Sequence, residues 1–174
     1  MKAEEVERLC ENYGADVYRF CIRMTGNCTD AEDLYQQTFL KLCEIKQKID
    51  WENNPRSFLL GVAALTAKSS RRRFARRQRL APQIQLFEEP GYKTAVPGAE
   101  QQSFEREQQE AVRQAVSALP QKLKAPVVLY YALELSVEEI ARALNIPAGT
   151  VKSRLYKARN QLREQMEEWR YARE

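Results

Sequence analysis

The residues best suited to a chemical role lie near the C-terminus, in a stretch with helical periodicity that follows Pro147. Between residues 148 and 163 the chain carries five cations and no carboxylate: Lys152, Arg154, Lys157, Arg159 and Arg163. Exposed helix faces usually mix Glu with Lys, because opposite charges four residues apart attract each other. A cationic face without acids is instead suited to the phosphates of a nucleic acid.

Two helical segments with a short break are predicted to position these cations. Ser136 and Glu139 stand three residues apart at the head of an apolar run, which is the capping-box pattern of a helix start. Residues 145–149, with Pro147 and Gly149, predict a turn. After the turn, the apolar positions fall on one stripe of a second helix: Val151, Leu155, Ala158 and Leu162.

The opposite face of that second helix is polar and cationic. It consists of Lys152, Ser153, Tyr156, Lys157, Arg159, Asn160 and Arg163, with Arg154 at its border. In a helix-turn-helix the second helix enters the major groove of DNA and presents side chains to base edges. We therefore expect this face to contact DNA. The alternative, a solvated charged face on a bundle helix, is disfavoured by the missing acids.

A second concentration of positive charge lies between residues 68 and 79, again without an acid. Its seven members are Lys68, Arg71, Arg72, Arg73, Arg76, Arg77 and Arg79. They run around the whole circumference of the predicted helix, which favours general attraction to phosphate over a defined reading face. An exposed basic helix end with no defined partner is the alternative interpretation.

The rest of the chain predicts further helices. Apolar residues recur at steps of three and four in helices predicted at about 3–24 and about 31–45, and a third helix begins after Pro55. Thr29 or Asp30 is expected to cap the second helix, and Pro126 to start a later helix or to kink it. No segment alternates as a strand would. We expect an all-α fold of two small helical bundles: residues 1–80, a flexible linker at 81–99, and residues 100–174 with the helix-turn-helix.

Composition excludes several classes of function. The 28 Lys and Arg against 24 Asp and Glu give a net charge of only +4, so the distribution of charge is more informative than its total. The chain has no histidine and no glycine-rich phosphate-binding or nucleophile-elbow pattern, so we expect no catalytic residue, no enzyme activity, no small-molecule substrate and no cofactor.

The cysteines and the hydropathy indicate neither a metal site nor a membrane span. Cys10, Cys21 and Cys43 fall on apolar helix faces without a C-x-x-C spacing, so we expect core thiols and no metal site. No apolar run approaches the length of a membrane span, and the first residues lack the pattern of a signal peptide. A cytoplasmic protein is expected.

Two longer stretches resemble one known family. "DAEDLYQQTFLKLCE" with "NNPRSFLLGVAALTAKSSRRR" resembles the promoter-melting domain, region 2, of bacterial RNA polymerase sigma factors. "LPQKLKAPVVLYYALELSVEEIARALNIPAGTVKSRLYKARNQL" resembles their helix-turn-helix domain, region 4. The resemblance covers about residues 5–165. With only these two domains, the chain is similar to the extracytoplasmic-function (ECF) group of the sigma-70 family.

The resemblance implies a dissociable subunit that directs core RNA polymerase to promoters and helps to melt them. Its partners would be promoter DNA and, on the core enzyme, the beta-prime clamp coiled coil and the beta flap. The resemblance also allows a cognate anti-sigma factor as a further partner. By match to the family motifs, the residues implied to recognise the upstream (−35) element are Thr150, Lys152, Ser153, Tyr156, Lys157 and Arg159.

The residues implied to recognise the downstream (−10) element are Trp51, Asn53, Asn54, Arg56, Lys68, Arg71, Arg72 and Arg73. Those implied to bind core polymerase are Asp33, Gln36, Gln37 and Phe39.

The chain departs from the family pattern at three positions. Gln37 stands where Glu is common, and Leu65 and Ser69 stand where many relatives have Asn and Asp. Readout of the melted element is therefore expected to be atypical. An alternative function, an autonomous helix-turn-helix regulator that binds duplex DNA without polymerase, is disfavoured by the N-terminal half. That half has the acid-rich start and the basic third helix expected for clamp and strand binding.

Overall fold

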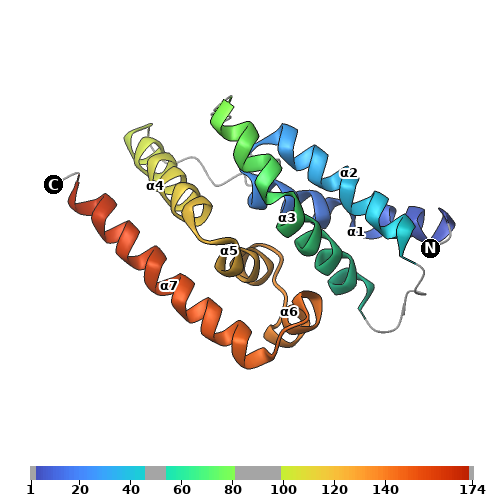
Figure 1. The fold of residues 1–174 in the computed structure, drawn as a ribbon. Coiled ribbons are helices and arrows are strands. Elements are labelled where there is room, and N and C mark those ends of the chain that lie inside the picture. The colour runs from blue at the N-terminus through green and yellow to red at the C-terminus, as the bar shows by residue number, and fades with distance from the viewer. Residues whose placement is uncertain (1–2, 46–53, 81–98, 173–174) are drawn as a thin grey trace.

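The computed structural model describes residues 3–45, 54–80 and 99–172, and side chains within these ranges except at 71–80 and 99–105. Figure 1 shows an N-terminal group of three helices, α1 (Ala3–Thr25), α2 (Cys28–Glu44) and α3 (Pro55–Leu80). The C-terminal half consists of α4 (Ala99–Ala118), α5 (Gln121–Val127), a π-helical turn η1 (Val128–Ala132), α6 (Val137–Leu144) and α7 (Ala148–Tyr171). Within the described ranges there is no strand, and the all-α prediction is confirmed.

The three N-terminal helices pack on one another through the apolar stripes predicted from the sequence. The largest fully buried side chains of this half include Leu9, Val17, Phe20, Leu34, Leu42 and Leu59. Burial of each such side chain stabilises the fold by about 1.5–3 kcal/mol relative to an exposed position. The bundle thereby fixes the surfaces of α2 and α3 on which the candidate binding residues lie.

The start of α2 differs from the sequence-based expectation. Its N-cap is Asn27, whose side chain accepts a hydrogen bond from the Asp30 backbone N–H at 2.8 Å, so the assignment of the cap to Thr29 or Asp30 is wrong. Gly26 has a φ of 79° and ends α1 abruptly, which lets the next helix begin at once. Only Gly26 and Asn27 connect the two helices, so α2 begins earlier than the sequence predicted.

Pro126 lies inside α5 rather than in its first turn, since the helix already begins at Gln121. A late helix start at this proline is therefore wrong. Proline lacks a backbone N–H and crowds the preceding turn. The chain widens directly afterwards into the π-helical turn Val128–Ala132, which takes up this disturbance.

The N- and C-terminal halves share one continuous hydrophobic core. It includes Leu9 and Leu59 from the first half and Leu129, Leu133 and Ile140 from the second. α6 packs against α3, and η1 packs against α1, whereas α7 lies on the far side of α5 and α6 from the N-terminal helices (Figure 1). Most of the expected linker, residues 81–98, lies outside the described residues.

Candidate nucleic-acid interface

The first helix of the helix-turn-helix begins with the predicted capping box. The Glu139 backbone N–H donates to Ser136 Oγ at 3.2 Å, and the Ser136 backbone N–H donates to Glu139 Oε2 at 2.8 Å. The bond from the Ser136 N–H and a second one from the Ser136 hydroxyl to the same Oε2 at 2.8 Å lower the pKa of the Glu139 carboxyl, because both favour its charged form. α6 is thus anchored at its start and buries Ile140 and Ala143.

The turn is shorter than predicted. α6 ends at Leu144, and its C-cap Asn145 adopts a left-handed conformation with φ 50° and ψ 52°. The Ile146 backbone N–H donates to the Ala141 carbonyl at 3.0 Å, which closes the helix end. α7 begins at Ala148, so Gly149 belongs to the helix and the residue with the positive φ is an asparagine.

The two faces of α7 are arranged as the sequence predicts. Val151, Leu155 and Ala158 are buried and Leu162 is half-buried. On the opposite side Lys152, Ser153, Tyr156, Lys157 and Arg159 are exposed, and Thr150 is half-buried. Tyr156 is 62% exposed. Within the described part of the chain no carboxylate pairs with Lys152, Lys157 or Arg159, which leaves this cationic face open to a ligand.

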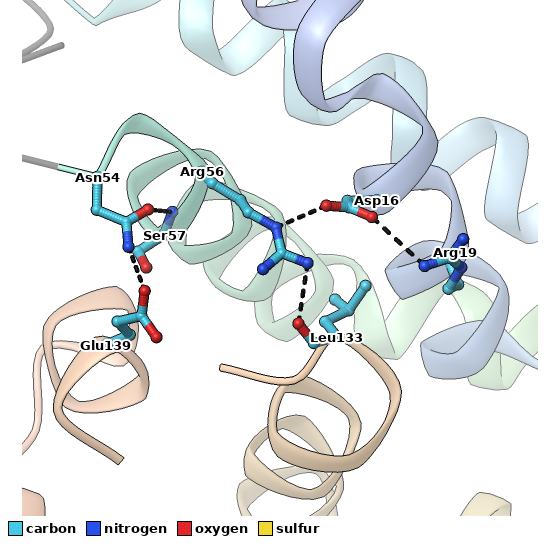
Figure 2. A network of polar contacts seen from close by, with 7 residues as sticks. All are labelled: Asp16, Arg19, Asn54, Arg56, Ser57, Leu133 and Glu139. Carbon is cyan, nitrogen blue, oxygen red and sulfur yellow. Dashed lines mark hydrogen bonds and ion pairs between the residues drawn. The ribbon is translucent and has the colours of Figure 1, made fainter. Parts of the chain in front are cut away.

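Two residues expected to act at the melted element are engaged within the protein. Asn54 Oδ1 accepts from the Ser57 backbone N–H at 3.0 Å and so caps α3, while its amide donates to Glu139 of α6. Arg56 donates from Nε to Asp16 at 2.6 Å and from a terminal nitrogen to the Leu133 carbonyl at 2.9 Å (Figure 2). Trp51 and Asn53 lie outside the described residues.

The remaining candidates on α3 lie in the second half of this helix. Lys68 is exposed, and Arg71, Arg72 and Arg73 continue the same helix, with side chains outside the described set. Leu65 is 60% exposed. Ser69 is exposed too, and its hydroxyl donates to the Thr66 carbonyl at 2.8 Å. The two departures from the family pattern therefore lie on the surface, where they can affect binding.

The candidate core-binding residues lie on α2. Gln36 is exposed, whereas Asp33, Gln37 and Phe39 are half-buried. Gln37 accepts a hydrogen bond from the Ser70 hydroxyl at 2.8 Å, and Phe39 packs on Tyr35 with ring centroids 4.8 Å apart. Leu40, which the sequence reasoning did not single out, is 65% exposed. Its apolar side chain lies outside the buried stripe of α2. An apolar residue at such a position is the feature of the sequence that could have indicated a binding residue.

The burial of the cysteines differs from the expectation that all three are core thiols. Only Cys21 of the three expected core thiols is buried, and burial raises its pKa to about 12. Cys10 and Cys43 are exposed, although Cys10 Sγ lies 3.3 Å from the Tyr35 hydroxyl. Both lie at the edge of an apolar stripe, where periodicity alone does not separate buried from exposed positions. Among the described residues no cluster of acids and cysteines could hold a metal ion.

Comparisons with known proteins agree with this arrangement. A family profile described as Sigma-70 region 2 matches residues 9–78, and one described as Sigma-70, region 4 matches residues 109–162. The ECF RNA polymerase sigma factor SigW of Bacillus subtilis is 30% identical over 165 residues, which cover 88% of this chain and 84% of SigW. SigE of Mycolicibacterium smegmatis is 30% identical over 158 residues, covering 91% of this chain and 60% of SigE.

A solved structure shows the same fold. It is the sigma factor RpoE in complex with the anti-sigma factor NepR from Bartonella quintana, with a TM-score of 0.66 and 19% identity, covering 95% of this chain and 98% of RpoE. Within the described segments of our protein, no helix has the length and apolar character needed to cross a membrane.

A helix-turn-helix with an open cationic face, tied to a second helical bundle with a basic third helix, defines a DNA-binding protein of the transcription machinery. The chain belongs to the family of ECF RNA polymerase sigma factors and acts as a sigma factor directing RNA polymerase. An autonomous regulator that never meets the polymerase is not favoured, because the region 2 match covers the half that such a regulator would not need.

Proposed function

We propose that this sigma factor binds core RNA polymerase through α2, reads the −35 element with α7, and captures the melted −10 element near the start of α3. The observation that carries the proposal is the acid-free, solvent-facing side of α7, with Lys152, Tyr156 and Lys157 exposed on a capped helix-turn-helix. The matched region 2 in the same chain supports the link to polymerase.

At the −35 element, α7 would lie in the major groove, which is about 12 Å wide and admits one helix. The residues proposed to contact DNA are Thr150, Lys152, Ser153, Tyr156, Lys157 and Arg159, all within the first half of α7. The hydroxyl and ammonium groups can donate to base edges or phosphates. Each good base contact is worth about 1–3 kcal/mol of discrimination, and each phosphate contact adds affinity without sequence preference.

At the −10 element, bases must leave the duplex, and unpairing costs a few kcal/mol per step unless a protein surface accepts the exposed bases. Trp51, Asn53, Asn54 and Arg56 are proposed to supply stacking and hydrogen bonds. Lys68, Arg71, Arg72 and Arg73 are proposed to attract the backbone of the separated strands. Leu65, exposed on α3 one turn before Lys68, is proposed as an apolar contact for bases, in place of the polar side chain common in relatives.

For core binding, we propose that the outer surface of α2 meets the beta-prime clamp coiled coil, and that the C-terminal half meets the beta flap. Gln36 is the best placed of the four candidates, because Gln37 is already bonded to Ser70 and Phe39 to the local aromatic packing. Leu40 beside it offers an apolar anchor. Asp33 completes the surface as a half-buried carboxylate.

The proposal includes three further points. The chain carries out no chemistry itself, since its candidate residues bind and position DNA for the polymerase. It works in the cytoplasm, where RNA polymerase and DNA meet. An anti-sigma factor is proposed as an additional partner, on the ground that the similar Bartonella protein is bound to one.

Run-off transcription tests the proposal. Purified core RNA polymerase with a genomic fragment library of the source organism should give discrete transcripts only when the chain is added. A set of transcripts that is the same with and without the chain would overturn it. Gln36→Ala should reduce core association while circular dichroism stays unchanged, and wild-type affinity for core would remove the docking assignment.

A further inference from the structure

Three exposed side chains form a narrow strip on α3. From Leu59 to Ser70, every residue is buried except Leu65, Lys68 and Ser69. These three stand at positions i, i+3 and i+4, so they lie next to one another on one face of the helix. The α3 strip is only about 6 Å long, at about 1.5 Å per residue. A helix that reads a major groove needs a whole side free, whereas this strip has room for a single base.

The hydroxyl protons of this stretch are all used inside the protein. Thr66 donates to the Val62 carbonyl at 2.8 Å. Ser70 donates to Gln37 Oε1, also at 2.8 Å. Ser69, whose side chain is exposed, donates to the Thr66 carbonyl at 2.8 Å. A serine hydroxyl has one proton and two lone pairs. Ser69 Oγ therefore faces solvent as a hydrogen-bond acceptor, with no proton left to donate.

Leu65 offers an apolar surface beside this acceptor. Its side chain is 60% exposed, and contact with the flat face of a base would remove apolar area from water. Every base has such a face, so contacts of this kind tolerate any sequence. Leu65 can therefore support a base without selecting among the four. Selection is left to the polar atom next to it, Ser69 Oγ.

Lys68 supplies positive charge on the same strip. Among the described residues no carboxylate pairs with its ammonium group. The helix continues with three arginines, and the sequence has no acid between residues 68 and 79. Positive charge of this density attracts the phosphates of any strand. The strip thus combines the groups that hold a strand with one acceptor that can read a base edge.

An acceptor without a proton discriminates among the four bases. Adenine has an amino group at ring position 6 and cytosine has one at position 4, and both groups donate hydrogen bonds. Guanine and thymine have carbonyl oxygens at these positions. Such an oxygen would face the lone pairs of Ser69 Oγ, and both acceptors would lose their bonds to water without gaining a partner. An amino base is therefore favoured over a keto base.

We propose that Leu65, Lys68 and Ser69 form a subsite for one unpaired base of the melted strand, and that Ser69 selects adenine or cytosine there. This inference rests on the proposed function, in which α3 lies against the separated strands, and it adds the class of base that α3 reads. The expected preference is about fivefold, the usual contribution of one neutral hydrogen bond. Because the strip is exposed in this structure, the full chain can be tested without polymerase.

Fluorescence anisotropy with labelled single strands of about 12 nucleotides measures the preference. Two pairs of strands keep the ring and exchange only the amino group for a carbonyl: oligo-deoxyadenosine against oligo-deoxyinosine, and oligo-deoxycytidine against oligo-deoxyuridine. The wild type should bind the amino member of each pair about fivefold more tightly. Equal affinity within either pair, or tighter binding of a keto member, would overturn the assignment.

Substitutions at Ser69 separate the protein's preference from differences among the strands themselves. Ser69→Ala should remove the preference. Ser69→Asp should keep it, because a carboxylate only accepts, and Ser69→Lys should reverse it, because an ammonium group only donates. Lys68→Ala should weaken binding of all four strands alike and leave the ratios unchanged. Ser117→Ala, at an exposed serine of α4, is the matched control and should behave as the wild type. Wild-type ratios in Ser69→Ala would overturn the inference.

Selection with the assembled holoenzyme separates this inference from the proposed function. The template is a promoter whose pre-melted segment carries random bases on the non-template strand. Molecules bound by wild-type holoenzyme should be enriched in adenine or cytosine at one position, and Ser69→Ala should lose that enrichment. A holoenzyme that initiates but has no position sensitive to Ser69→Ala would overturn the subsite and leave the sigma function intact. A chain that fails to join core would overturn the proposed function, while the oligonucleotide data still test what Ser69 selects.

Discussion

Removal of the ammonium group at Lys152 isolates the contribution of the α7 surface. Lys152 is exposed in the first turns of α7 and pairs with no carboxylate among the described residues. Lys152→Ala should therefore change the free energy of unfolding by less than about 0.5 kcal/mol. Any change in DNA binding then reports on the interface and not on the fold.

The size of the effect depends on what the ammonium meets. A contact with a base edge should cost about 1–3 kcal/mol on the specific sequence and little on random duplex. A contact with phosphate should lower affinity for both and reduce the salt slope by about 0.9. Between about 50 and 200 mM salt, the wild type would then lose about 3.5-fold more affinity than the variant, since fourfold more salt is raised to that power.

Fluorescence anisotropy with labelled specific and random duplexes over a salt series measures both quantities. Arg170→Ala is the matched control, because Arg170 is an exposed cation on the same helix, 18 residues further on and about 27 Å away along its axis. Unchanged affinity and slope for Lys152→Ala on both duplexes would refute the assignment. Equal losses for the two variants would show that only overall charge matters.

Three further predictions follow from single contacts. Ser136→Ala should lower the free energy of unfolding by about 1 kcal/mol, the usual value of a lost N-cap, in urea titrations. The Glu139 pKa is depressed in the folded state, so its stabilising effect is present above the pKa of the unfolded chain and is lost as the pH falls through the folded value. Ser136→Ala keeps the bond from the backbone N–H, which is the largest cause of the lowered pKa, and removes only the bond from the hydroxyl, so stability should become slightly less dependent on pH in that range; a profile that became steeper would count against the hydroxyl bond. With thiol reagents at neutral pH, exposed Cys10 and Cys43 should react well before Cys21, as mass spectrometry can follow; early labelling of Cys21 would contradict its burial.

Much of the fold could be predicted because helix periodicity is local. The stripe of Val151, Leu155 and Ala158 is buried as predicted, and the capping box at Ser136 is formed. The helix ends were predicted less well. Asn27 caps the start of α2, where the sequence favoured Thr29 or Asp30, and Asn145 closes α6 as the first residue of the turn predicted from Pro147 and Gly149. Several residue types can cap or end a helix, so spacing alone did not select among them.

The contacts between the two halves could not be predicted at all. In the sequence, nothing distinguishes Gly61 from other helix glycines or Lys124 from other surface cations. Only the structure shows that Gly61 faces α6 and that Lys124 bonds to α1. Such contacts join residues 80 to 100 positions apart, and no local pattern encodes them. The candidate site is affected in the same way: the sequence indicates Asn54 and Arg56 as binding residues but gives no sign that the protein itself occupies them.

Site-specific photo-crosslinking in the assembled polymerase tests the central claim most directly. A photoreactive amino acid in place of Tyr156, which is 62% exposed on α7, should cross-link to duplex DNA about 35 base pairs upstream of the transcription start. The same probe in place of Leu65, which is 60% exposed on α3, should cross-link about 25 base pairs further downstream, at the melted segment. Adducts from both positions at the same base pairs, or no DNA adduct from position 156, would contradict the account.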